Sequence, residues 1–64
     1  MKLDTEKVIE KYKDRIFAIG LSILKNPDDA DDVVQETFLK YHTYKKDFES
    51  KEHIQSWLYK VAIN

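Results

Sequence analysis

The chain has 64 residues, enough for one small domain with a marginal hydrophobic core. It contains no cysteine, which excludes disulfides, thiolate zinc sites, iron–sulfur clusters and cysteine nucleophiles. Its 11 lysine and arginine residues oppose 12 aspartate and glutamate residues. The resulting net charge of −1 lacks the positive excess of a protein that binds duplex DNA by itself.

The first predicted helix spans residues 4–25, and Asp4 or Thr5 can cap its start. Apolar residues at alternating steps of three and four form one face, and further apolar residues widen it. The face consists of Val8 or Ile9, Tyr12, Ile16, Ile19 and Ile23, widened by Phe17, Leu21 and Leu24. We therefore expect the second half of this helix to be buried on two sides. Gly20 costs about 1 kcal/mol relative to alanine, so we expect a neighbouring helix to approach closely there.

The second predicted helix spans residues 27–44. Asn26 can end the first helix or cap the second, and Pro27 suits the first helical position. The predicted inner stripe is Ala30, Val34, Phe38 and Tyr41, flanked by Val33 and Thr37, whereas Asp32, Gln35, Glu36 and Leu39 fall on another face. The helix dipole explains acidic residues in the first turn but not Glu36. The residues alone leave open whether this acidic face is merely solvated or binds a basic partner.

Residues 45–49 lack periodicity and are predicted to form a loop. Ser50 is a good N-cap for a third helix over residues 50–64, with Ile54, Trp57, Leu58 and Val61 at core spacing. The apolar pattern reaches the last residue without a stop signal, so we expect the third helix to be truncated. No strand-like alternation occurs. The sequence therefore predicts an all-α fold, a compact three-helix bundle, as one domain over residues 1–64.

Metal binding and catalysis find little support in the sequence. Counting from Asp28, the third position of an EF-hand loop would be Ala30 and its glycine position Val33, so a calcium loop is excluded. His42 and His53 lie outside any metal-binding spacing. No nucleophile–base pair or cofactor motif is present, and we expect no catalytic residue, metal or cofactor. The longest nearly apolar stretch, residues 16–24, is far short of the roughly 20 residues of a membrane span. We expect a cytoplasmic protein without a membrane partner.

Aromatic residues alternate with lysines in residues 40–48, and again in residues 57–60. This pattern suits single-stranded nucleic acid, because bases stack on rings while lysines meet phosphates. Aromatic residues at helical spacing are more often core, and spacing alone favours that interpretation. Phe48 fits it least, because it is an apolar ring in a polar loop. We therefore expect Phe48→Ala to leave the fold nearly intact.

Two segments, DADDVVQETFLK at residues 29–40 and WLYKVAIN at residues 57–64, flank Phe48. Together they resemble region 2 of the sigma-70 family of RNA polymerase sigma factors, and the extracytoplasmic-function subgroup fits best. The resemblance covers the chain from about Glu10 onward. Two separate motifs in the right order and at the right spacing make it specific. One departure is Ile63, where the family often has a basic residue, and this removes one phosphate contact.

The resemblance implies roles for particular residues. Asp32, Gln35 and Glu36 would dock on the clamp helices of the polymerase β′ subunit. The loop from Lys45 to Ser50, centred on Phe48, would capture a base flipped from the minus-ten promoter strand. The DNA-binding residues implied in this way are Lys45, Lys46, Phe48, Lys60 and Asn64. Ile54, Trp57 and Leu58 would hold the recognition helix against the core.

The function implied is promoter recognition and melting during transcription initiation. RNA polymerase core and the minus-ten element as a single strand would be the partners, with an anti-sigma factor as a further one, and no cofactor would be needed. The alternative is a three-helix protein-interaction module without nucleic-acid binding. Phe48 discriminates the two, because an exposed or pocket-forming ring favours DNA and a deeply packed ring favours the interaction module.

Overall fold

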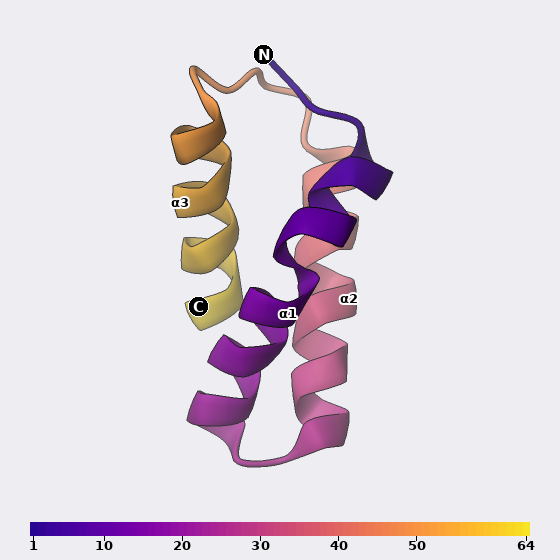
Figure 1. Ribbon diagram of the computed structural model, residues 1–64, viewed down its shortest axis with the longest axis vertical. Helices are drawn as coiled ribbons and strands as arrows, with labels where there is room; N and C mark the ends of the chain where they lie inside the picture. The colour runs from indigo at the N-terminus through magenta and orange to yellow at the C-terminus, as the bar shows by residue number, and fades with distance from the viewer.

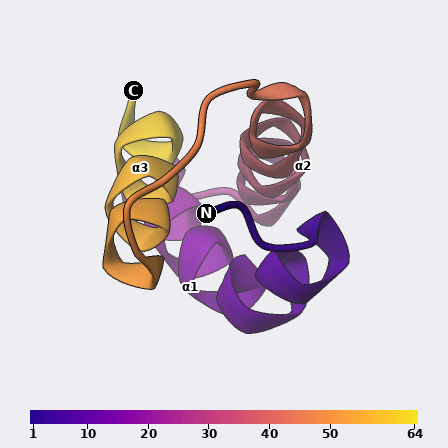
Figure 2. The ribbon, with the colours of Figure 1, turned by 90° about the horizontal axis from the view of Figure 1, so that it is seen from above.

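The computed structural model describes residues 1–64 as three helices joined by two short connections (Figure 1). Helix α1 spans Thr5–Leu24, α2 spans Pro27–Thr43 and α3 spans Lys51–Ile63. Helices α1 and α2 run antiparallel, and α3 packs against both of them (Figure 2). The predicted all-α three-helix bundle is confirmed, and each predicted helix end lies within one residue of the observed end.

Local capping chemistry explains where the helices begin. The Asn26 side chain accepts hydrogen bonds from the backbone N–H groups of Asp28 at 2.8 Å and Asp29 at 3.1 Å. Ser50 accepts one from the N–H of His53 at 3.1 Å. Asn26 and Ser50 therefore satisfy N–H groups that a helix start leaves unpaired. Asp4 also occupies an N-cap position, but its side chain makes no capping hydrogen bond.

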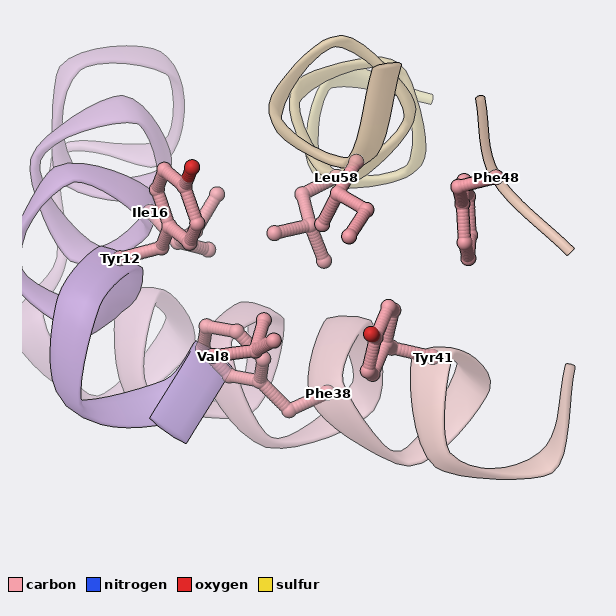
Figure 3. Close-up of a cluster of buried hydrophobic side chains, with 8 residues drawn as sticks. Val8, Tyr12, Ile16, Phe38, Tyr41, Phe48 and Leu58 are labelled. Atoms are coloured by element: carbon pink, nitrogen blue, oxygen red, sulfur yellow. The ribbon is translucent and has the colours of Figure 1, made fainter. Parts of the chain in front are cut away.

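The core lies where the three helices and the connection between α2 and α3 meet (Figure 3). Every predicted helical stripe contributes to it, and the connection contributes one ring. Its buried members are Val8, Tyr12, Ile16, Phe38, Tyr41, Phe48, Ile54 and Leu58. Trp57 and Val34, which the spacing placed in the core, are partly buried and pack against this cluster.

Gly20 lies at a close approach of α1 to α2, as its position in the sequence predicted. A Cβ atom added there would lie 3.2 Å from the Cα of Ala30 and 3.4 Å from the Cβ of Val33. Ala30 itself is fully buried. The small side chains at these two positions therefore let the helices approach one another at this point.

The end of α1 differs from the prediction that its second half is buried on two sides. Leu21 is 36% exposed, Ile23 53% and Leu24 44%. The physical reason is visible in Figure 1, where α3 packs beside the upper part of α1 and does not extend along its last turn. The part of that turn beyond the end of α3 therefore meets solvent.

Candidate functional site

The outer face of α2 brings together the three residues for which docking was predicted. Asp32, Gln35 and Glu36 are all exposed and point away from the stripe that carries Phe38 and Tyr41. Their spacing of three and four places them beside one another on the helix surface. The carboxylate of Glu36 pairs with the ammonium group of Lys40 at 3.3 Å. Asp32 and Gln35 make no side-chain hydrogen bond or ion pair, so their polar groups are free to meet a partner.

Leu39 extends this face with an apolar group. It is 63% exposed, more than any other large hydrophobic residue of the chain. It borders a shallow groove of about 380 Å³ between α1 and α2, lined by Thr5, Ile9, Val34, Gln35, Phe38, Leu39 and His42. The sequence pattern placed Leu39 on the acidic face but assigned it no role, because only the structure shows its exposure and the groove beside it.

Phe48 is buried, which corrects the expectation for this ring. Only 2% of the residue is exposed, and its ring stacks on Tyr41 with centroids 5.6 Å apart. Tyr44 and Trp57 approach it at 5.3 and 5.7 Å. Figure 3 shows the ring on the side of the core that the connection closes, near Tyr41 and Leu58. The prediction that Phe48→Ala would leave the fold nearly intact does not agree with this packing.

The burial of Phe48 depends on a contact that no local pattern reveals. The backbone N–H of Phe48 donates to the carbonyl oxygen of Met1 at 2.8 Å, and the terminal ammonium group of Met1 donates to the carbonyl of Phe48. These bonds join residues 47 positions apart. They turn the connection inward, and its one apolar ring then enters the core. From the sequence, a deeply packed Phe48 ring favours the interaction module and an exposed ring favours DNA. The burial of Phe48, taken alone, therefore favours the interaction module.

The remaining predicted DNA-binding residues form two groups and not one cluster. Lys45 and Lys46 are exposed in the connection before α3, while Lys60 and Asn64 are exposed at its other end. The Asn64 backbone N–H donates to the Lys60 carbonyl oxygen at 3.0 Å, so these two share one helical turn. At 1.5 Å per residue, α3 is about 20 Å long, and the two groups lie toward its opposite ends.

Tyr41 links the core to the N-terminal residues. Its side chain is fully buried, and its hydroxyl donates to the carbonyl oxygen of Leu3 at 2.8 Å. Burial raises the pKa of the Tyr41 hydroxyl, and the nearby Asp4 carboxylate raises it further. The hydroxyl therefore keeps its proton at neutral pH, as a hydrogen-bond donor must.

No group of three histidine, aspartate or glutamate side chains comes together in a way that could hold a metal ion. None of the three helices combines the length and the apolar character that crossing a membrane requires.

Comparison with known proteins assigns the chain to a family. Residues 8–64 match the family model of sigma-70 region 2. The chain is 30% identical over 57 residues to the ECF RNA polymerase sigma factor SigW of Bacillus subtilis (strain 168), covering 89% of this chain and 30% of SigW. It is 34% identical over 55 residues to the RNA polymerase sigma factor SigV of the same organism, covering 86% of this chain and 33% of SigV.

A third relative, the RNA polymerase sigma-H factor of Pseudomonas aeruginosa, is 30% identical over 57 residues, covering 89% of this chain and 30% of that factor. The chain thus spans about a third of the length of the curated relatives it matches. No solved structure matches it. The acidic face of α2, the loop around Phe48 and the exposed end of α3 all lie inside the matched residues, and the chain belongs to the sigma-70 region 2 family.

Proposed function

We propose that this chain acts in transcription initiation as the part of an extracytoplasmic-function sigma factor that docks on RNA polymerase core and contacts promoter DNA. The observation that carries the proposal is the outer face of α2, where Asp32, Gln35 and Glu36 stand exposed on one helix face. The family match supports the sigma-factor role as a whole. The docking partner and the DNA strand are the parts that experiment must test.

The chemistry of the α2 face fits a basic helical partner. Asp28, Asp32 and Glu36 follow one another at steps of four, and like charges at this spacing repel by a few tenths of a kcal/mol per pair. A partner that brings lysine or arginine side chains would relieve this repulsion and pair with Asp32. Leu39 beside it supplies an apolar contact. We propose the clamp helices of the polymerase β′ subunit as this partner.

The DNA-contacting surface is proposed to consist of the two exposed groups at the ends of α3. Lys45 and Lys46 at one end, and Lys60 and Asn64 at the other, can meet phosphates and base edges along a single strand of the minus-ten element. Two groups toward opposite ends of α3 suit an extended strand more than one captured base. Phe48, whose ring is buried, supports the loop from within. Since the chain is nearly neutral, polymerase binding must supply much of the affinity.

Docking is tested by calorimetric titration of the chain with isolated β′ clamp helices. We expect Asp32→Lys to weaken binding at least about tenfold through charge reversal. Asp14→Lys is the matched control, because Asp14 is exposed on the outer side of α1 and makes the same change in net charge. Loss of binding in Asp32→Lys but not in Asp14→Lys supports docking through α2.

One observation, the burial of Phe48, favours the alternative of a three-helix protein-interaction module without nucleic-acid binding. A folded chain that binds neither the clamp helices nor, in their presence, single-stranded DNA would establish that alternative. An anti-sigma factor is a further proposed partner, and competition with the clamp helices would show whether it covers the α2 face.

A further inference from the structure

The N-terminal residues form hydrogen bonds with the connection between α2 and α3 and with the end of α2. Three residues make these contacts, and we refer to Met1–Leu3 as the clasp and to Tyr44–Ser50 as the loop. The Met1 carbonyl oxygen accepts from the Phe48 N–H at 2.8 Å, and the Leu3 carbonyl oxygen accepts from the Tyr41 hydroxyl at 2.8 Å. Figures 1 and 2 both place the N-terminus beside the loop at one end of the bundle.

Lys2 makes the third contact. Its ammonium group donates to the carbonyl oxygens of His42, at 3.4 Å, and Tyr44. It also lies 5.1 Å from the centre of the Tyr41 ring, within the range of a cation–π interaction. His42 lies in the last turn of α2 and Tyr44 is its C-cap, and a cation is favoured at this end of a helix. Lys2 thus fixes the point where the loop leaves α2, and Met1 fixes its middle.

The clasp lies outside the part of the chain that matches the family, because the match begins at residue 8. The loop has no regular secondary structure, so contacts with other segments must hold its shape. A loop that is ordered before binding loses less conformational freedom when a ligand arrives, and this raises affinity. The loop is also the segment to which the proposed function assigns Lys45 and Lys46.

We propose that the clasp holds the loop in the shape that receives single-stranded DNA, with Lys2 and Tyr41 as positioning residues. The ordering of the loop follows from the contacts of the clasp alone. The effect of this ordering on DNA binding rests on the proposed function. The two parts therefore need separate measurements.

Loop order is tested by hydrogen exchange of the Phe48 amide. The variants are Lys2→Met, which keeps the aliphatic stem, and Tyr41→Phe, which keeps the ring. We expect the double variant, Lys2→Met with Tyr41→Phe, to speed exchange at Phe48 at least about fivefold relative to the Ile16 amide, the factor expected for the loss of a single hydrogen bond. The Ile16 amide lies within α1 and reports opening of the whole bundle.

Matched controls separate the clasp from general effects. Lys7→Met removes an exposed lysine of α1 that has no hydrogen bond or ion pair, and Tyr12→Phe removes a hydroxyl without a hydrogen-bond partner in the protein. Both controls should leave the ratio of Phe48 to Ile16 exchange rates unchanged. An unchanged ratio in the double variant would overturn the clasp.

DNA binding is then measured with a short random-sequence single-stranded DNA in the presence of the β′ clamp helices. Tyr41→Phe changes no charge, so we expect it to weaken DNA binding about threefold to fivefold by loosening the loop while clamp-helix binding stays unchanged. Equal DNA affinity in wild type and Tyr41→Phe would overturn the effect of the clasp on DNA. Absence of DNA binding in the wild type would instead contradict the DNA part of the proposed function, and the exchange ratio would still decide whether the clasp orders the loop.

Discussion

Phe48 occupies the centre of an aromatic cluster that closes one end of the bundle. Its ring is within 6 Å, centroid to centroid, of Tyr41 at 5.6 Å, Tyr44 at 5.3 Å and Trp57 at 5.7 Å. The His53 ring lies at a steep angle to it, with centroids 5.1 Å apart, and the Nδ1 of the same histidine accepts a hydrogen bond from the Glu49 N–H at 3.0 Å. The loop therefore gains its shape from one buried ring and the groups around it.

Phe48→Ala should destabilise the fold strongly. Replacing a buried phenylalanine by alanine costs about 3–5 kcal/mol, which is a large part of the roughly 3–10 kcal/mol expected for a domain of this size. We expect the midpoint of urea denaturation to fall sharply, or the chain to be unfolded without denaturant. Leu39→Ala, at an exposed position, should change stability by less than about 0.5 kcal/mol. A Phe48→Ala midpoint equal to that of the wild type would show that the ring is not part of the core.

Tyr41 gives the fold a stability that depends on pH. Its pKa is raised in the folded chain above the ordinary value of 10.0, chiefly by burial. As the pH rises through 10.0, the unfolded chain therefore releases this proton more readily than the folded chain, and the free energy of unfolding falls. We expect Tyr41→Phe to lose less stability than the wild type between pH 9 and pH 11, measured by urea denaturation around the 10.0 value. The same fall in both chains would mean that another group carries the effect.

At the scale of the helices, Gly20 sets how closely α1 approaches α2. In an exposed helix, changing glycine to alanine stabilises by about 1 kcal/mol. Here the added methyl group would lie 3.2 Å from the Cα of Ala30, which is a backbone atom and cannot move alone. The propensity gain and the steric cost therefore oppose one another at this position.

We expect Gly20→Ala to be destabilising, because the two helices must separate to admit the methyl group and this loosens their contact. Ser22→Ala, at an exposed position of the same helix, should instead stabilise by up to about 0.5 kcal/mol through helix propensity. Thermal unfolding of the two variants beside the wild type compares them directly. A Gly20→Ala chain more stable than the wild type would show that α1 and α2 adjust without cost.

The helices could be predicted from the sequence because their signals are local. Asn26 and Ser50 mark helix starts by their own side-chain chemistry, and the stripe that includes Tyr12 and Ile16 repeats within a few residues. The exposure of Leu24 could not be predicted, because it depends on how far α3 extends along α1. The burial of Phe48 could not be predicted either, because it depends on hydrogen bonds to Met1 at the other end of the chain.

In the candidate site, too, some features follow from local sequence signals and others depend on how distant segments pack. The acidic face of α2 follows from helical spacing once the motif with Asp32, Gln35 and Glu36 is recognised. The groove beside Leu39 needed the structure, since the pattern that placed Leu39 outside the inner stripe says nothing of the surface between α1 and α2. The placement of Lys46 and Lys60 toward opposite ends of α3 follows from the predicted bounds of that helix.

For the whole molecule, charge distribution matters more than net charge. A net charge of −1 does not attract DNA strongly, and the outer face of α2 carries acidic residues suited to a basic protein surface. Exposed lysines occur on all three helices, and those assigned to DNA, Lys45, Lys46 and Lys60, lie in the loop and on α3. The proposed function therefore gives the module one surface for a protein partner and another for a nucleic-acid strand, and binding of the protein would bring the second surface to the strand.

The most direct test of this account is the affinity of the chain for isolated β′ clamp helices, measured by calorimetry at low and at high salt. Docking through exposed carboxylates predicts that the affinity falls as salt rises, since salt screens charges that face solvent. Asp32→Lys should bind weakly at both salt concentrations and lose most of this dependence. Wild-type affinity independent of salt, or Asp32→Lys binding as tightly as the wild type, would contradict the account.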